Sequence, residues 1–135
     1  TRTAFVGEPA APVLDAYRRL VEVNQEICAA ARPGSTGWEL DQLLGELLGK
    51  AGLDPSPYGL GHGIDLRVME PPTLFATARD WTLRAGEVIA LEPETSIEHR
   101  GRRVTVKVED CYLVEESGLR PLTPPAGGEP FVISA

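Results

Sequence analysis

The sequence predicts an α+β fold, in which two amphipathic helices pack on a curved antiparallel sheet. Two observations carry this prediction: apolar residues recur at three- and four-residue spacing before residue 52, and apolar and polar residues alternate after residue 87. The 135 residues, 42% of them hydrophobic and 24% charged, are sufficient for a domain with its own core. We expect residues 1–123 to form this domain and residues 124–135, which are rich in Pro and Gly, to form a tail.

The elements follow in order along the chain. A short apolar run at 2–7 predicts a strand, and the helical spacing of apolar residues over 12–31 predicts a first helix that ends at the following Pro-Gly pair. Thr36 and Glu39 fit a capping box, in which each side chain satisfies a free backbone N–H at a helix start. A second helix is therefore predicted from here to Gly52, with one apolar face made of Leu40, Leu43, Leu44, Leu47 and Leu48.

The second half of the chain predicts strands. After residue 52 the sequence reads as a loop rich in Pro and Gly, followed by an apolar strand at 87–93 and an alternating strand at 103–114. Residues 116–118 predict a turn, and residues 119–125 a last short strand. The basic run at 99–103 reads as a solvated hairpin tip.

Composition limits the function classes. The net charge of −7 argues against a nucleic-acid partner, because phosphate binding needs a surplus of Lys and Arg. No apolar run is long enough to span a membrane and no signal peptide is visible, so the default expectation is a cytoplasmic protein without a membrane partner. Cys28 and Cys111 lie in unrelated segments without CxxC spacing, which indicates reduced thiols.

Three residues are candidates for chemistry: His62 in a glycine-flanked loop, Glu92 at the end of a strand before a proline, and Glu109 among valines. Taken singly, each has a structural interpretation. His62 fits a turn residue, Glu92 a surface carboxylate at a strand end, and Glu109 the exposed side of a two-sided strand.

Together with their surroundings, these residues carry a family resemblance. The segments GHGIDLRVMEPP (61–72), LRAGEVIALEPE (83–94) and VKVEDCYLVEESGLRPLT (106–123) resemble, in order and spacing, the signature segments of the creatinase and methionine aminopeptidase superfamily, peptidase family M24. TRTAFVG at the start and RPGSTGWELD at 32–41 match it as well. The family includes Xaa-Pro aminopeptidases and prolidases, and the resemblance implies its "pita-bread" fold.

The resemblance also implies a metal site. His62, Glu92 and Glu109 match three of five ligands that hold two divalent ions, Mn, Co, Fe or Zn, and Glu92 matches the residue that takes a proton from the attacking water. Two aspartates complete the family's set, the second lying just before the position of Thr1, and this chain has no match for them. We therefore expect the chain to be the C-terminal portion of a longer domain. Alone it would bind no ion or one ion weakly, and its opening strand would form an exposed edge.

Three positions depart from the family pattern at the substrate side. Tyr58 and Met69 stand where histidines are usual, and Lys107 where arginine is usual; the resemblance implies substrate-binding roles for all three. The leading hypothesis is a dinuclear hydrolase, in family terms a homodimer, acting on a small peptide or amide. The alternatives are a non-peptide amide or amidine hydrolase or lyase on the same fold, and a catalytically inactive binding domain.

Overall fold

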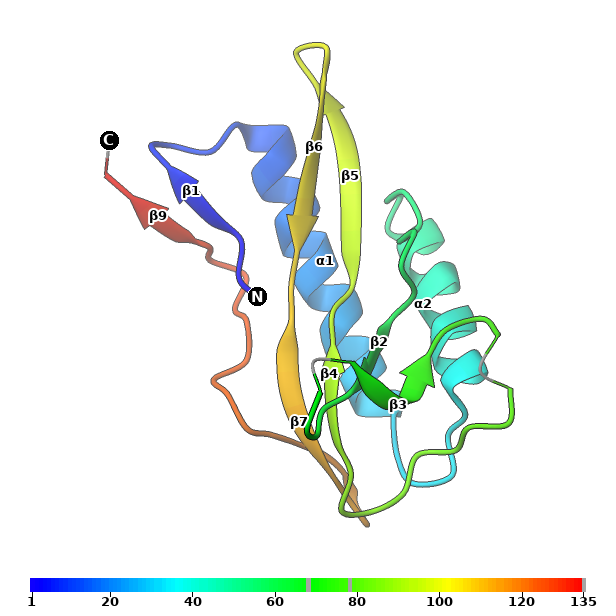
Figure 1. The fold of residues 1–135 in the computed structure, drawn as a ribbon. Coiled ribbons are helices and arrows are strands. Elements are labelled where there is room, and N and C mark those ends of the chain that lie inside the picture. Colours follow the sequence, from blue (N-terminus) through cyan, green and yellow to red (C-terminus); the bar gives the residue numbers. More distant parts are fainter. Residues whose placement is uncertain (68, 78, 135) are drawn as a thin grey trace.

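The computed structural model describes residues 1–67, 69–77 and 79–134. Two long helices, α1 (Ala11–Ala30) and α2 (Gly37–Lys50), pack against antiparallel strands, so the predicted α+β class is confirmed (Figure 1). The strands are β1 (Ala4–Val6), β2 (Gly61–Gly63), β3 (Glu70–Leu74), β4 (Val88–Leu91), β5 (Glu94–His99), β6 (Arg102–Lys107), β7 (Asp110–Glu115), β8 (Gly118–Pro121) and β9 (Phe131–Ile133).

The strands form three groups. A five-stranded antiparallel sheet has the order β3-β2-β4-β7-β8, β5 and β6 form a hairpin, and β1 pairs with β9 in parallel. Only Glu92 and Pro93 separate β4 from β5, and only Val108 and Glu109 separate β6 from β7. Two nearly continuous strands therefore run from the sheet into the long hairpin that projects at the top of Figure 1.

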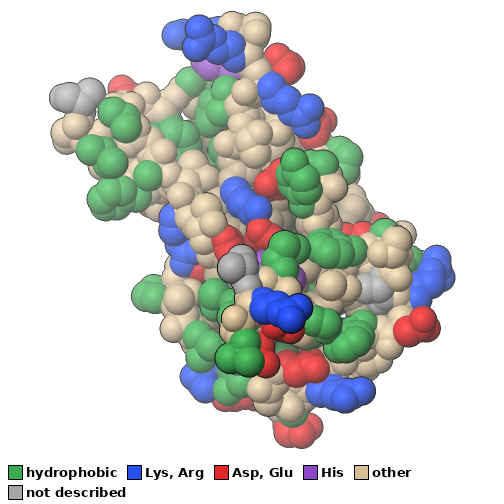
Figure 2. All heavy atoms as spheres, viewed as in Figure 1, with side chains coloured by type: hydrophobic (Ala, Val, Ile, Leu, Met, Phe, Trp, Pro, Cys, Tyr) green, Lys and Arg blue, Asp and Glu red, His purple; other side chains and the backbone are tan. Residues whose placement is uncertain are grey.

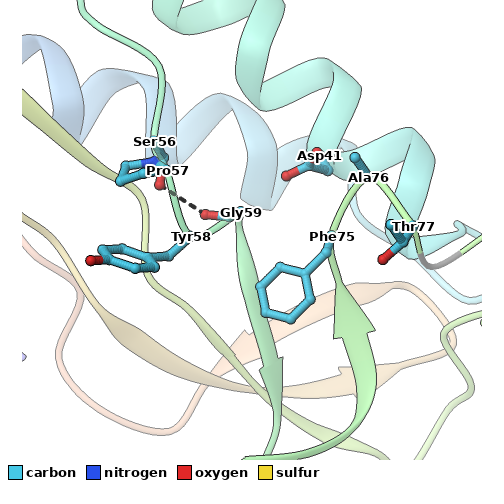
Figure 3. Close-up of a pocket in the computed structure, with 8 residues that line it drawn as sticks. All are labelled: Asp41, Ser56, Pro57, Tyr58, Gly59, Phe75, Ala76 and Thr77. Carbon is cyan, nitrogen blue, oxygen red and sulfur yellow. Dashed lines mark hydrogen bonds between the residues drawn. The ribbon is translucent and has the colours of Figure 1, made fainter.

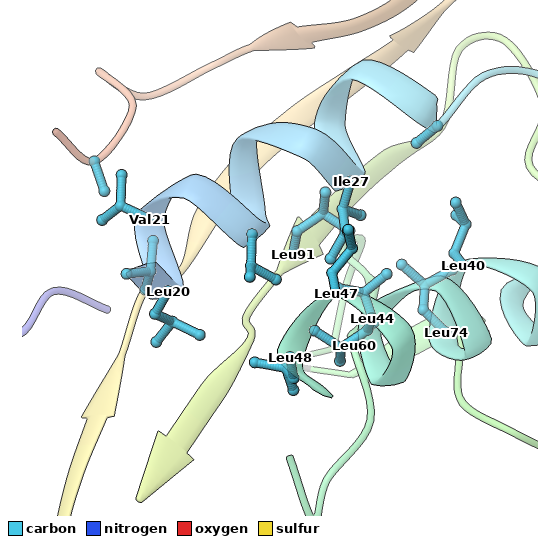
Figure 4. Close-up of a cluster of buried hydrophobic side chains, with 14 of the residues drawn as sticks. Leu20, Val21, Ile27, Leu40, Leu44, Leu47, Leu48, Leu60, Leu74 and Leu91 are labelled. Atoms are coloured by element: carbon cyan, nitrogen blue, oxygen red, sulfur yellow. The ribbon is translucent and has the colours of Figure 1, made fainter. Parts of the chain in front are cut away.

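The two helices supply most of one face of the hydrophobic core. α1 contacts α2, β5, β6 and β8, and α2 also contacts β3. Figure 4 shows buried side chains of the two helices, among them Leu20, Ile27 and Leu44. From the side of the sheet it shows Leu60, just before β2, and Leu91 of β4. Leu43 of the predicted stripe is only partly buried, while the other four leucines are buried.

The predicted capping box is present at the start of α2. The Glu39 carboxylate accepts hydrogen bonds from the backbone N–H and the hydroxyl of Thr36, both at 2.9 Å, and the backbone N–H of Glu39 donates to the Thr36 hydroxyl at 3.1 Å. These bonds satisfy donors that a helix start leaves unpaired. They fix the entry to α2, whose other end leads to the segment before β2.

Two expectations from the sequence were wrong. The segment after residue 52 is not loop throughout, because it contains β2 and β3, and His62 therefore lies in a central strand. The strand predicted at 103–114 is divided at Val108 and Glu109, and β5 was not predicted. Within the region 124–135, expected as a tail, β9 pairs in parallel with β1, and in this two-stranded sheet each strand keeps one unpaired edge.

Among the described residues, none of the helices combines the length and the apolar character that a membrane crossing requires. Basic side chains gather at the tip of the β5–β6 hairpin, at the top of Figure 2, as expected from the run at 99–103.

Candidate metal centre

His62, Glu92 and Glu109 come together where the two long strands bend. One ligand atom from each, the imidazole nitrogen or a carboxylate oxygen, lies within 4.8 Å of the other two. His62 is buried, and the Glu92 and Glu109 side chains are 16% and 21% exposed. Imidazole and carboxylate are ligands that first-row divalent metals accept, so the donor set fits a metal ion.

The bends have a local cause in the sequence. Pro93 has no backbone N–H and cannot continue the ladder, and its carbonyl instead accepts from Val108 at 3.1 Å. The N–H of Glu92 donates to the carbonyl of Leu60 at 2.7 Å. The breaks in the two strands therefore lie opposite one another, and each places one glutamate at the base of the hairpin.

A hydrogen bond to the backbone leaves one ring nitrogen of His62 free to bind a metal ion. Its Nδ1 lies 2.9 Å from the carbonyl oxygen of Gly63, and because a carbonyl can only accept, Nδ1 carries the proton. Nε2 is then the basic nitrogen, and it lies 3.6 Å from Oε1 of Glu92. A ring nitrogen fixed by a backbone carbonyl is a common support for metal-binding histidines.

The glycines on either side of His62 allow close packing rather than loop flexibility. A Cβ at Gly61 would lie 2.0 Å from the carbonyl oxygen of Ala90, and one at Gly63 would lie 2.2 Å from that of Pro71. β2 pairs with β4 on one side and β3 on the other, and the register to β3 shifts between His62 and Gly63. The backbone that carries His62 is therefore fixed from both sides.

Glu109 is held by groups from the start of the chain. Its Oε2 accepts from the backbone nitrogen of Thr1 at 2.8 Å, and its backbone N–H donates to the Thr1 carbonyl at 3.1 Å. The backbone around Glu109 is therefore fixed by the segment before β1, and its carboxylate faces His62 and Glu92.

Lys107 lies beside the cluster and contacts two carboxylates. Its Nζ is 2.5 Å from Oε2 of Glu92 and 3.5 Å from Oε2 of Glu94. Burial lowers the pKa of Lys107, but hydrogen bonds and charge from the two glutamates outweigh it, so the pKa is raised and Lys107 is a cation. Figure 2 shows basic, acidic and histidine side chains adjoining at the middle of this face.

Glu94 was not identified from the sequence. Its pairing with Lys107 depends on β5, which was not predicted.

Tyr58 lies in a different cavity, of about 410 Å³, lined by Asp41, Ser56, Pro57, Tyr58, Gly59, Phe75, Ala76 and Thr77. In Figure 3 the Tyr58 ring lies at the left and the Asp41 carboxylate at the upper right, with the Phe75 ring below Asp41. Burial raises the pKa of Asp41. Tyr58 is 69% and Met69 57% exposed, so neither is packed into the ligand cluster. Of the three predicted substrate-side residues, only Lys107 directly contacts a candidate ligand.

Comparisons with known proteins agree with this architecture. An Xaa-Pro dipeptidase of Pyrococcus furiosus is 34% identical over 124 residues, which are 91% of this chain and 34% of that protein. The structure of dipeptidase PepE from Mycobacterium ulcerans superposes with a TM-score of 0.82 at 31% identity, over 99% of this chain and 35% of the other. The prolidase from Pyrococcus horikoshii OT3 gives the same TM-score and identity, over 93% and 35%.

The fold and these neighbours define a pita-bread α+β protein with a candidate metal centre. The model of metallopeptidase family M24 matches residues 1–116. The chain belongs to metallopeptidase family M24, as its signature segments predicted. It spans about a third of the length of the curated relatives that it matches.

Proposed function

We propose that the protein containing this chain is a dinuclear metal-dependent hydrolase that cleaves small peptides, with Xaa-Pro dipeptides as the first candidate substrates. The observation that carries the proposal is the convergence of His62, Glu92 and Glu109 within 4.8 Å, on the fold of a metallopeptidase family. The Xaa-Pro dipeptidase named among the relatives supports the substrate class.

The remaining ligands come, in this proposal, from upstream of the chain. Residues 1–123 are then the C-terminal portion of the catalytic domain, and two upstream aspartates complete a five-ligand set. The third of the relatives' length that this chain spans supports this division. The metal is Mn, Co, Fe or Zn, since these ions accept both imidazole and carboxylate ligands. The homodimer and the cytoplasmic location stay predictions.

The residues of the chain have separable roles. When bound, two divalent ions would polarise the scissile carbonyl and lower the pKa of a water to about 7. His62 presents Nε2 because its Nδ1–H donates to Gly63. Glu92 receives the proton of the attacking water, and the Lys107 ammonium lies 2.5 Å from its Oε2. Tyr58, Met69 and Lys107 contact the substrate.

The chain offers a matched control for the test. It has two histidines, and His99 lies at the end of β5, next to the hairpin tip. We would prepare the full-length protein and its His62→Ala and His99→Ala variants, equilibrate each with Mn²⁺, separate free ion by gel filtration, and measure bound metal by mass spectrometry. The expected result is about two ions per chain in the wild type and in His99→Ala, with loss in His62→Ala.

Activity is then measured on a panel of Xaa-Pro dipeptides and compact non-peptide amides. Hydrolysis of the dipeptides that disappears with His62 supports the proposal. If the protein binds metal but hydrolyses only the non-peptide amides, it is a metallohydrolase whose substrates are non-peptide amides rather than peptides. A wild-type protein without bound metal would overturn the metallohydrolase proposal.

A further inference from the structure

The ammonium of Lys107 lies between a candidate metal ligand and a second carboxylate that is not one. Lys107 and Glu94 face each other across the β5–β6 hairpin, and Nζ of Lys107 is 3.5 Å from Glu94 but only 2.5 Å from Glu92. Glu94 is buried, 9% exposed. In the part of the chain that the structure describes, Lys107 is the one charged partner within ion-pair distance of its carboxylate.

Burial of Glu94 requires compensation. A buried carboxylate is destabilising unless a cation or hydrogen-bond donors accompany it. Further along the same face of the hairpin the cross-strand pairs are Ser96 with Thr105, whose hydroxyl oxygens are 2.8 Å apart, and Glu98 with Arg103. Glu94 is therefore the member of this polar row next to the metal cluster, and its position is defined by Lys107.

The contact of Lys107 with Glu92 conflicts with metal binding by Glu92. An ammonium that donates to a carboxylate occupies an oxygen lone pair and opposes a second cation at the same group. Lys107 also lies two residues before Glu109 on the same strand face, so all three of its acidic neighbours attract it. A ligand-competent Glu92 needs another acceptor for the ammonium, and Glu94 is within reach.

We propose that Glu94 is a positioning residue of the metal centre, which holds the Lys107 ammonium when Glu92 serves as a ligand. The inference rests on the proposed function in taking His62, Glu92 and Glu109 as ligands. Glu94 itself touches neither metal nor substrate. Its role is to keep the charge of Lys107 near Glu92 without letting it occupy the ligand oxygen, and thereby to set the affinity for the divalent ion.

The first test measures Mn²⁺ affinity by isothermal titration calorimetry on the full-length protein. Glu94→Gln removes the alternative anion, so Lys107 stays on Glu92, and we expect about tenfold weaker Mn²⁺ binding, as for other groups that support a ligand from outside. Glu98→Gln is the matched control, because it removes the same charge from the same strand face further from the cluster. We expect less than about a twofold change there, since exposed charges are screened.

A second measurement does not depend on the stability of any variant. In a crystal structure of the wild-type protein with Mn²⁺, Lys107 Nζ is expected to lie within hydrogen-bonding distance of Glu94 and outside that distance from Glu92.

A third variant tests the charge. Glu94→Asp keeps the carboxylate and is expected to recover part of the Mn²⁺ affinity that is lost in Glu94→Gln.

The outcomes separate the two proposals. If the wild type binds Mn²⁺ and Glu94→Gln binds it with the same affinity, the role of Glu94 is overturned. The same holds if Lys107 still contacts Glu92 in the crystal with Mn²⁺. Either result leaves the proposed function intact. An equal loss in Glu94→Gln and Glu98→Gln also overturns it, because it indicates a general charge effect. Absence of Mn²⁺ binding by the wild type overturns both.

Discussion

Gly61 in β2 lies directly against the carbonyl of Ala90 in β4, so that a Cβ at position 61 would be 2.0 Å from that oxygen. No side chain fits this space unless the two strands separate. Because His62 is the next residue, the distance between β2 and β4 also sets the position of the imidazole.

We therefore predict that Gly61→Ala lowers the free energy of unfolding by about 1–3 kcal/mol through overpacking. It should also weaken metal binding, since His62 is displaced. Gly45→Ala is the control, because a Cβ there meets nothing within 4 Å in the middle of α2, and replacing a helical glycine by alanine stabilises by about 0.5–1 kcal/mol. Urea denaturation measures both. Equal stability of Gly61→Ala and wild type would contradict the close approach.

The helices could be predicted because their signals are local. The expected ranges 12–31 and 36–52 compare with Ala11–Ala30 and Gly37–Lys50, and the capping box at Thr36 identified the second start. β2 could not be predicted, because its glycines look like loop residues in the sequence. They are needed because residues distant in sequence, such as Ala90, pack closely against them in the folded protein.

The candidate cluster was only partly accessible to sequence reasoning. The family segments named His62, Glu92 and Glu109 as one ligand set, but the local pattern did not show how they meet, since this depends on the break at Pro93 and the matching break after Lys107. The alternation across 103–114 continues through the break, with Val106, Val108 and Asp110 all buried, so nothing in the pattern marked it. Glu94 was not singled out, because β5, in which it pairs with Lys107, was not predicted.

The capping box of α2 supports a second prediction. Thr36→Ala removes the hydroxyl that accepts from the Glu39 N–H, and we expect a loss of about 1 kcal/mol in the free energy of unfolding. Thr36→Ser keeps the hydroxyl and serves as control. Thermal unfolding followed by circular dichroism measures the difference, and a similar loss in both variants would argue against the cap.

The same cap has a pH dependence of known sign. Hydrogen bonds from the Thr36 backbone N–H and hydroxyl lower the pKa of Glu39 below its ordinary value of 4.5. Because the folded pKa is the lower one, this stabilisation is complete above the ordinary pKa and is lost as the pH falls through the folded pKa. The gap in stability between wild type and Glu39→Gln should therefore shrink from pH 7 to strongly acidic pH.

Cys28 is predicted to be a slow thiol. Burial raises its pKa to about 11, and a hydrogen bond with Tyr112 offsets this only in part. Because the thiolate is the reactive form, alkylation by iodoacetamide at pH 8 should be about a hundredfold slower than for free cysteine. The rate is measured by mass spectrometry of the peptide that contains Cys28, with urea-unfolded protein as control. A rate equal to that of the unfolded protein would contradict the burial.

Arg2 and Asp110 form the ion pair that joins the start of the chain to the metal side of the sheet. The Asp110 side chain is fully buried, and it also accepts from the backbone N–H of Ala126 at 3.0 Å. The Arg2 guanidinium in addition donates to the carbonyls of Glu109 and Pro124. One side chain therefore connects three segments next to a candidate ligand.

Arg2→Met should lower the free energy of unfolding by about 2–3 kcal/mol, because it leaves a buried carboxylate without its cation. The control is Arg18→Met, since Arg18 pairs with Glu129 at the surface at 2.7 Å, and loss of an exposed pair costs less than about 1 kcal/mol. Arg2→Met should also weaken Mn²⁺ binding, because the backbone of Glu109 loses a donor. If chemical denaturation shows the same small effect for both variants, the buried pair does not anchor this part of the fold.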